Sequence, residues 1–414
     1  MSIIKPFKAV RPDVTTVEAI AALPYDVYSS QEARAFVADR PLSFLKIDRA
    51  ETFFDPSVDI HSPKVYQKAH DALYEMIEKG ALVQESKAVL YLYQLTMDGR
   101  EQTGLVTCTS VDAYIKGSIK KHENTRADKE LDRINHVDYC DANTGPIFLT
   151  YKSKVTITNL SEDWKKGHDP LFDFIAEDGV GHKVWLIDEP TMITSLVEAF
   201  ARVEALYIAD GHHRAASAVK VAQMRRETNP EYTGEEPYNY FLSVLFPDDQ
   251  LSILDYNRVV KDLNGLSQDQ FLEALSHKFD IVEKSDQAIR PKDKGTFGMY
   301  LNKQWYKLLA KEGSYDNEDP VKKLDVAILQ DNLLTPILGI GDLRVDNRID
   351  FVGGIRGLKE LERRVALDME VAFSMYPTSI TELIDIADAG ELMPPKSTWF
   401  EPKLRSGVFI HLLK

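Results

Sequence analysis

Cysteine is scarce in this 414-residue sequence, and long apolar runs are missing from it. The two cysteines, Cys108 and Cys140, do not have the spacing of a metal site, so we expect both to be reduced thiols, as in cytoplasmic proteins. No stretch approaches the roughly 18 consecutive apolar residues that a membrane span needs, and the first residues lack the apolar segment of a signal peptide. The sequence therefore predicts a cytoplasmic protein with no membrane partner.

Basic residues are in the minority, because 50 lysines and arginines stand against 65 aspartates and glutamates. The net charge is −15, and the isoelectric point is near 5.2. A protein that holds a duplex needs a basic face, and no segment is rich in lysine and arginine. We therefore expect no nucleic-acid partner, whereas a local basic pocket for a small anion is compatible with this composition.

Several patterns with known chemistry are absent. The sequence contains no G-x-x-x-x-G-K-[ST], no G-x-G-x-x-G, no H-E-x-x-H, no G-x-S-x-G and no C-x-x-C. Any nucleotide site is therefore of neither the Walker nor the Rossmann type. The chain does have 44% apolar residues, which is enough for a core, and its length indicates two or three domains or one domain with large insertions.

The apolar periodicity predicts an α/β protein with mixed sheets. We expect helices at residues 62–80, 191–202, 266–279, 324–338 and 381–392. We expect strands at residues 88–97, 104–110, 147–151, 183–187, 239–246, 349–352 and 370–374. Residues 160–182 are acidic and contain glycine, so we interpret them as an irregular surface excursion.

The most informative stretch spans residues 205–217. It opens with an apolar run that has the pattern of a buried strand, and it breaks at Asp210-Gly211, which is a turn signal. An alanine-rich segment then continues to Gln223 and predicts a helix. Strand, tight turn and helix N-terminus thus follow one another within about a dozen residues, an arrangement that places ligands at strand ends in α/β proteins.

The start of this predicted helix suits an anion. The first backbone N–H groups of a helix have no internal partner, and the helix dipole is positive there. Gly211 allows close approach, and Arg214 adds a planar charged fork for phosphate oxygens. His212 and His213 can donate hydrogen bonds, bind a metal or move protons. The alternative is that Asp210 caps an ordinary helix whose first turn is polar.

A second polar stretch, residues 119–133, contains His122, Glu123, Thr125 and Arg133. One interpretation is a capping box formed by Thr125 and Asp128, followed by a solvated helix face. The other is a second helix N-terminus that binds an anion. The sequence favours neither.

Three other segments supply candidate residues. Asp26, in a loop near the N-terminus, could be a general base, a metal ligand or a turn former. Asn143 lies at the end of the helix that starts near residue 128. Lys396, Ser397 and Thr398 follow a rigid Pro-Pro pair and offer a cation and two hydroxyls for phosphate.

The segment Ile208–Arg214 resembles the phosphate-binding signature of the ParB/sulfiredoxin-like superfamily. Its closest counterpart there is the branch of ADP- or ATP-dependent free-serine kinases. Further motifs, spread over nearly the whole chain, look like those of a widespread prokaryotic family long filed as a domain of unknown function, number 1015. They are Leu23–Val27, His122-Glu123-x-Thr125, Asp132-Arg133, Ala142-Asn143-x-x-Pro146-Ile147-Phe148 and Met393–Thr398.

The resemblance implies a ParB/sulfiredoxin-like core in which the 210–211 turn and the following helix bind a nucleotide or a transferred phosphate. We expect this core, with insertions, to span residues 1–260, and a C-terminal α/β subdomain, residues 261–414, to return its final loop to the site. The serine kinases use an acidic residue near the N-terminus as base. Asp26 is the best positional match, although no glutamate corresponds. The basic helical region of the DNA-binding ParB proteins is missing here.

The leading hypothesis is phosphoryl transfer between a nucleotide and a small hydroxyl metabolite, with L-serine and O-phospho-L-serine as the expected pair. The same site would act as a phosphatase if water were the acceptor. Mg²⁺ would bridge the oxygens of ADP or ATP. The expected catalytic residues are Asp26, Glu123, His212 and His213. The expected phosphate-binding residues are Asp210, Gly211, His212, His213, Arg214, His122, Thr125, Arg133, Asn143, Lys396, Ser397 and Thr398.

Two other classes of function stay open. One is a non-catalytic regulatory protein that binds a nucleotide or metabolite at the same anion site. The other is a metal-dependent hydrolase with His122, Glu123, His212 and His213 as ligands. Oligomeric state is also open, with a homodimer as one option. In every case we expect Asp26, His122, Arg133, Asn143, the 210–214 turn and Lys396 to line one cleft.

Overall fold

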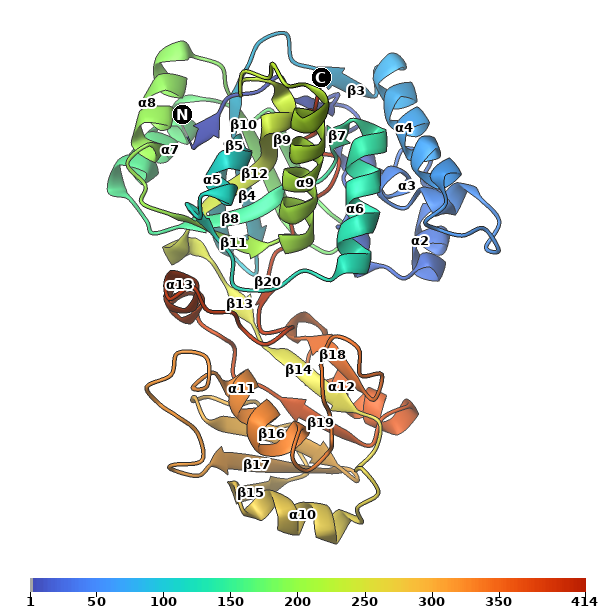
Figure 1. Cartoon of the computed structure of the whole chain (residues 1–414), viewed down its shortest axis with the longest axis vertical. Helices are drawn as coiled ribbons and strands as arrows, with labels where there is room; N and C mark the ends of the chain where they lie inside the picture. Colours follow the sequence, from blue (N-terminus) through green and yellow to red (C-terminus); the bar gives the residue numbers. More distant parts are fainter. Residues whose placement is uncertain (1–2) are drawn as a thin grey trace. The chain divides into compact units, whose positions relative to one another are not determined.

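The computed structural model describes residues 3–414, which fall into two compact units. Unit 1 comprises residues 3–121, Thr125–Leu251 and Pro402–Lys414, and unit 2 comprises His122–Asn124 and Ser252–Glu401. The predicted mixed α/β class is confirmed, because each unit combines a sheet with helices (Figure 1). The chain passes into unit 2 after residue 251 rather than 260, since the strand Tyr256–Val260 belongs to the sheet of unit 2.

Unit 1 is built on a nine-stranded mixed sheet with the strand order β6-β11-β8-β12-β5-β4-β10-β9, and with β1 beside β5. The strands are β1 Ile4–Lys5, β4 Leu90–Met97, β5 Arg100–Ser110, β6 Ile119–Lys120, β8 Ile147–Tyr151, β9 Phe172–Ile175, β10 Gly181–Ile187, β11 Leu206–Asp210 and β12 Tyr240–Pro247. The pairs β12–β8 and β11–β6 are parallel, and the other pairs are antiparallel. Strands β8 and β12 are buried along their whole length, as continuous apolar runs predict.

Helices and short strand pairs complete unit 1. The helices are α1 Val17–Ile20, η1 Tyr25–Val27, α2 Ser30–Val37, α3 Leu45–Asp48, η2 Ala50–Phe53, α4 Pro63–Glu78, α5 Val111–Ile115, α6 Ala127–Cys140, α7 Val155–Gly167, α8 Pro190–Phe200, α9 His212–Thr228, η3 Pro237–Asn239 and η4 Asp248–Gln250. The pairs are β2 Val10–Pro12 with β3 Leu82–Gln84, and β7 Ala142–Asn143 with β21 His411–Leu412. Helices α6 and α9 lie side by side (Figure 1).

The prediction of an irregular excursion at residues 160–182 was wrong. This stretch contains most of α7 and the strand β9. Ile157 and Trp164, two helical turns apart, are the buried side of α7, while Phe172 and Phe174 alternate with exposed residues in β9. Glu162, Asp163 and Asp173 stand on the outer sides of these elements, whereas Asp169, Glu177 and Asp178 lie in the short connections between elements.

Unit 2 contains a six-stranded antiparallel sheet with the order β15-β17-β16-β19-β14-β18, and a separate pair, β13 with β20. The strands are β13 Ile253–Leu254, β14 Tyr256–Val260, β15 Phe279–Ser285, β16 Thr296–Leu301, β17 Gln304–Ala310, β18 Ile349–Gly353, β19 Val371–Ser374 and β20 Trp399–Phe400. The helices are α10 Gln268–Ser276, α11 Asp325–Leu329, the π-helix η5 Gln330–Leu334, η6 Gly354–Arg356, α12 Leu358–Leu367 and α13 Ile380–Asp388. The helix predicted at 324–338 is therefore shorter and changes to π geometry at its middle.

The last residues of the chain, 402–414, belong to unit 1. Ile410 and Val10 exchange backbone hydrogen bonds of 2.8 and 3.0 Å, and Ser406 and Ala22 do the same at 2.8 and 3.1 Å. These bonds place residues 403–406 beside the N-terminal segment. Both cysteines are buried, free thiols. No helix in residues 3–414 is long and apolar enough to cross a bilayer.

Candidate functional site

The strand, turn and helix predicted around residue 210 are present. Strand β11 ends at Asp210, Gly211 takes the left-handed conformation with φ +93°, and α9 begins at His212. Within the described residues no side-chain hydrogen bond caps this helix, so its first N–H groups keep their positive potential. Arg214 therefore stands in the first turn of a helix whose N-terminus suits an anion.

Asp210 is anchored by the chain around it. One carboxylate oxygen accepts the N–H of Gly211 at 2.8 Å, and the other pairs with the ammonium of Lys403 at 3.1 Å. Burial alone would raise the pKa of Asp210, but Lys403 and Arg214 hold it well below its usual range. Asp210 is therefore ionised, and it fastens the turn to the C-terminal segment.

Gly211 is expected to be sensitive to any side chain. A Cβ on this residue would lie 3.0 Å from Nε and 3.1 Å from Nη2 of Arg214. We expect Gly211→Ala to lower the free energy of unfolding by about 1–2 kcal/mol, because the left-handed conformation is strained for alanine, and to weaken phosphate binding because Arg214 must shift. Urea unfolding and calorimetric titration with inorganic phosphate measure the two effects.

The matched control is Gly80→Ala, which has φ +76° but no neighbour within 4 Å of its Cβ. It should lower stability by a similar amount and leave phosphate binding unchanged. Equal phosphate affinities for the two variants would show that Gly211 does not position Arg214 for an anion.

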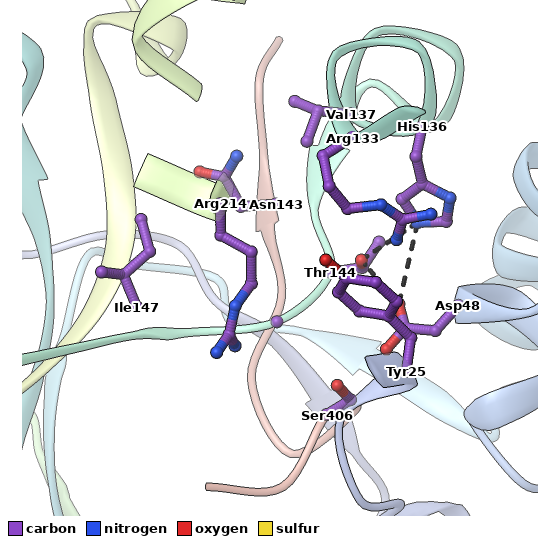
Figure 2. A pocket seen from close by; sticks show the side chains of 11 residues that line it. Tyr25, Asp48, Arg133, His136, Val137, Asn143, Thr144, Ile147, Arg214 and Ser406 are labelled. Atoms are coloured by element: carbon purple, nitrogen blue, oxygen red, sulfur yellow. Dashed lines mark hydrogen bonds and ion pairs between the residues drawn. The ribbon is translucent and has the colours of Figure 1, made fainter. Parts of the chain in front are cut away.

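A polar pocket in unit 1 adjoins this helix start. It holds about 430 Å³ of space free of atoms, open solvent included. Two arginines, an aspartate and a histidine line it, and Figure 2 shows Arg133, His136 and Asp48 on one side and Arg214 on the other. The lining residues are Tyr25, Asp48, Arg133, His136, Val137, Asn143, Thr144, Gly145, Ile147, Arg214 and Ser406. We call this the anion pocket.

Arg214 enters the anion pocket from α9. Its Nη1 donates to the carbonyl of Pro146 at 2.5 Å, and a Cβ on Gly145 would lie 3.5 Å from the same nitrogen. Within residues 3–414 this side chain makes one hydrogen bond, to Pro146, which leaves most of the guanidinium's five donors for a ligand.

Arg133 enters from α6 and is almost fully buried. It forms an ion pair with Asp132 at 2.7 Å, and its guanidinium lies 4.1 Å from the ring centroid of Tyr25. Burial alone would lower the pKa of Arg133, but Tyr25, Asp132 and Asp48 raise it above its usual value. Burial also raises the pKa of Tyr25 to about 12. Arg133 is therefore a permanent cation stacked on a neutral phenol.

Asp48, at the end of α3, is the buried acid of the pocket. It accepts a hydrogen bond from the Thr144 hydroxyl at 2.9 Å and another from Ser406. Because Thr144 donates to Asp48, its oxygen accepts from Nε2 of His136 at 3.2 Å. Burial raises the pKa of Asp48 in spite of these bonds and of the two arginines. Burial and the charge of Arg133 lower the pKa of His136 to about 3, so this ring is neutral.

Of the residues predicted for the site, Arg133, Asn143 and Arg214 line this one pocket. Asp26 is exposed on η1 and is not a lining residue. Asn143 also has a structural part, because its side-chain oxygen accepts the N–H of Leu242 at 3.1 Å.

Three other predicted residues of unit 1 lie at the start of α9 or just before α6. His212 is buried, and Nε2 of His213 accepts the backbone N–H of Arg126 at 3.0 Å, so that nitrogen carries no proton. Thr125 donates to the carboxylate of Glu130 at 2.6 Å. The capping box of Thr125 with Asp128 is not formed, since the N-cap residue of α6 is Arg126 and it has no side-chain cap.

The other predicted residues belong to unit 2. His122 lies 3.5 Å from the Thr398 hydroxyl, and its carbonyl accepts the N–H of Met393 at 2.8 Å. The Ser397 hydroxyl donates to the carbonyl of Pro394 at 2.6 Å, and Lys396 has its ammonium 5.7 Å from the ring centroid of Tyr256. Glu123 is half-buried. The assignment of these residues to phosphate binding, and of Glu123 to catalysis, stays a prediction.

Residues 4–327 match the family model described as Protein of unknown function (DUF1015). The chain belongs to this family. No curated protein matches the chain significantly.

Solved structures similar to the chain include three of different origin. One is a free serine kinase in complex with AMP, at 15% identity and TM-score 0.35, over 73% of this chain and 91% of that chain. Another is SbnI with a C-terminal truncation, from Staphylococcus aureus, at 12% identity and TM-score 0.37. The match covers 74% of this chain and 87% of that chain. The third is a conserved hypothetical protein from Pyrococcus furiosus, at 15% identity and TM-score 0.35. The match covers 74% of this chain and 95% of that chain. These are distant likenesses.

Proposed function

We propose that unit 1 catalyses phosphoryl transfer between a nucleotide and a small hydroxyl metabolite, with L-serine and O-phospho-L-serine as the first pair to test. The observation that carries the proposal is the anion pocket, which gathers Arg133 and Arg214 around one small cavity in a chain of net charge −15. The likeness of Ile208–Arg214 to a phosphate-binding signature supports the same function.

Phosphoryl transfer asks a protein chiefly for positioning and for cancellation of charge on the moving group. The forks of Arg133 and Arg214 can each hold two oxygens of a phosphoryl group. Arg214 also stands at the positive end of α9, which adds to the potential. Thr144 and Ser406 hold the Asp48 carboxyl by hydrogen bonds, and the charges of Arg133 and Arg214 act on it in the same pocket.

Mg²⁺ with ADP or ATP remains part of the proposal, but the anion pocket offers no ligand set for the metal. Mg²⁺ prefers several oxygen ligands. Asp48 is the one carboxylate among the lining residues, and it is hydrogen-bonded and subject to the charges of Arg133 and Arg214. The metal would therefore arrive on the nucleotide, and the roles described here are those of the protein's own side chains.

Arg214→Ala tests the site. We expect it to weaken the binding of inorganic phosphate, ADP and O-phospho-L-serine about ten- to a hundredfold, since a charge-assisted contact is worth about 1.5–3 kcal/mol. Arg214→Lys should restore part of the affinity, because an ammonium cannot reproduce the fork. The melting temperature should fall only slightly, through loss of the hydrogen bond to Pro146. Titration calorimetry and thermal melts on the same samples give both numbers.

Lys220→Ala is the matched control, because it removes one positive charge from an exposed position of the same helix. It should leave all affinities unchanged. Transfer of the labelled terminal phosphoryl group of ATP or ADP to L-serine, detected as labelled O-phospho-L-serine, tests turnover. Binding that depends on Arg214 without any turnover would favour a regulatory, nucleotide- or metabolite-binding protein. Unchanged binding in Arg214→Ala would overturn the site itself.

A further inference from the structure

A second pocket of unit 1 lies directly beside the anion pocket. It holds about 440 Å³ of space free of atoms, open solvent included, and it shares with the anion pocket the residues Tyr25, Asp48, Arg133 and His136. The stacked pair of Tyr25 and Arg133 is therefore a common wall. We call this second cavity the histidine pocket, because His61 is one of its lining residues.

His61 is held there by a largely buried carboxylate. Its Nδ1 lies 3.2 Å from Oδ1 of Asp132 and 3.4 Å from the hydroxyl of Tyr66. Tyr66 donates to the same carboxylate oxygen at 2.9 Å, and Arg133 binds the other oxygen through Nε and Nη2 at 2.9 and 2.7 Å. The backbone is also fixed, since the N–H of His61 donates to Asp59 at 2.9 Å just before α4 begins.

This arrangement sets the tautomer of the imidazole. A carboxylate can only accept, so in the neutral ring Nδ1 of His61 carries the proton and Nε2 keeps its lone pair. Although burial alone would raise the pKa of Asp132, Arg133 and Tyr66 lower it to about 2, so Asp132 stays ionised. An ionised carboxylate behind a histidine holds the ring in one orientation and stabilises the imidazolium that forms when Nε2 takes a proton. His61 also has 52% of its side chain exposed, so a ligand can reach it.

We propose that His61 is the general base of the reaction and that Asp132 is its positioning residue. The proposal rests on the proposed phosphotransferase function. The acceptor binds in the histidine pocket with its hydroxyl at the border of the anion pocket. Nε2 of His61 takes the hydroxyl proton while the acceptor oxygen forms a bond to phosphorus. The bond from phosphorus to the nucleotide's bridging oxygen breaks, and that oxygen keeps the electron pair. In the reverse direction the imidazolium returns the proton.

The acids considered for this role are less suitable. Asp26 is exposed and lines neither pocket. Asp48 is buried, and its carboxyl accepts hydrogen bonds from Thr144 and Ser406 that would have to break before it could take a substrate proton. His136 donates Nε2–H to Thr144 and is neutral. His61 alone among these groups combines an orienting carboxylate with an accessible, unprotonated nitrogen.

His61→Gln is the test, and His70→Gln is its matched control. His70 lies on α4, is partly exposed, and has its Nδ1 3.2 Å from Asp71, the same distance as in the His61 pair, but it lines neither pocket. We expect His61→Gln to lower kcat about 10²–10⁴-fold, the usual range for loss of a general base. The affinities for ADP and inorganic phosphate should stay within about threefold of wild type, and His70→Gln should behave as wild type.

Two further measurements separate a base from a structural residue. The acid limb of the wild-type pH–rate profile should coincide with the titration of the His61 ring followed by NMR, and it should vanish in His61→Gln. Other charged or titratable groups also face this pocket, and the profile must be compared with the NMR titration for that reason. They are Tyr25, Asp48, Arg49, Glu51, Tyr66, Lys129, Asp132, Arg133 and His136. In Asp132→Asn the ¹⁵N shifts of the ring should show a loss of the Nδ1–H form.

The outcomes distinguish the two proposals. Turnover that survives His61→Gln with an unchanged pH profile overturns the assignment of His61 and leaves the phosphotransferase intact. A wild-type protein that binds phosphate but transfers it to no hydroxyl compound overturns the proposed function, and the base with it. Loss of kcat together with the acid limb, at unchanged nucleotide affinity, supports the assignment.

Discussion

Arg133→Met should lower the free energy of unfolding by about 3–5 kcal/mol, the usual cost of removing one partner of a buried ion pair. Arg133 is 7% exposed and gives two nitrogens to Asp132, which is itself largely buried. Methionine fills similar space but leaves that carboxylate without its nearest cation. Asp48, which Arg133 also stabilises, loses part of its compensation. Phosphate binding should be lost in the same variant, because one of the two forks of the anion pocket is gone.

The double variant Arg133→Met/Asp132→Asn decides the cause. If stranded charge is responsible, neutralising Asp132 should restore much of the stability without restoring phosphate affinity. The matched control is Arg126→Met at the start of the same helix, where the pair with Asp128 is exposed and should be worth at most about 1 kcal/mol. Urea unfolding at pH 7 measures all three. A loss below 1 kcal/mol for Arg133→Met would show that Arg133 does not offset the cost of burying the Asp132 charge.

Much of the fold follows from local pattern. The run 205–209, the turn and the alanine-rich segment gave β11, a left-handed Gly211 and α9, because each signal is carried by neighbouring residues. The predicted helix 62–80 is α4, and Ser29 caps α2 with Glu32 in a capping box. The prediction for residues 160–182 was wrong because it relied on their acidic composition. The acidic residues of 160–182 hid an apolar face that appears only at helical and strand spacing.

The candidate site was only partly visible in the sequence. Arg133, Asn143 and Arg214 were found because they stand in dense polar segments at element ends. Asp48, Thr144 and Ser406 were missed because their hydrogen bonds join segments far apart in the chain. A signal did exist for Asp48, which shares a helical face with the buried Phe44 and Leu45, since residues three and four apart are neighbours. An acid on an apolar face predicts a buried polar contact.

His61 could not be predicted as a site residue from the sequence either. Its own neighbours are turn residues before a proline that starts a helix, and this pattern is common and carries no chemistry. Asp132 was noted as part of a polar stretch and of the Asp132-Arg133 motif, without a role of its own. The pair is created by the packing of α4 against α6, which no local pattern specifies. Residue types can therefore be nominated from sequence, whereas the pairing that gives them a role requires the tertiary structure.

The stability of unit 2 should fall as the pH rises, because of one buried acid. Asp325, at the start of α11, is 8% exposed and accepts the N–H of Gly295 with both oxygens, at 3.0 and 3.2 Å. Burial, together with the nearby Glu382, raises its pKa from 3.8 to about 7. The folded state then holds the proton more tightly than the unfolded state. Stability is therefore highest below about pH 4 and is lost progressively between about pH 4 and pH 7.

Asp325→Asn should remove this pH dependence. A rise of about three pKa units corresponds to about 4 kcal/mol, at 1.36 kcal/mol for each unit. The amide keeps an oxygen for the N–H of Gly295 but cannot ionise. The variant should therefore match wild type near pH 4 and be more stable by up to about 4 kcal/mol at pH 8.

The measurement is urea unfolding at both pH values with pulsed hydrogen exchange, read on the peptides of β16 and β17 so that unit 2 is followed separately. The control Asp331→Asn, at an exposed position close by, should show no difference between the two pH values. If Asp325→Asn and wild type are equally stable at pH 8, the pKa of Asp325 is not raised in the folded protein.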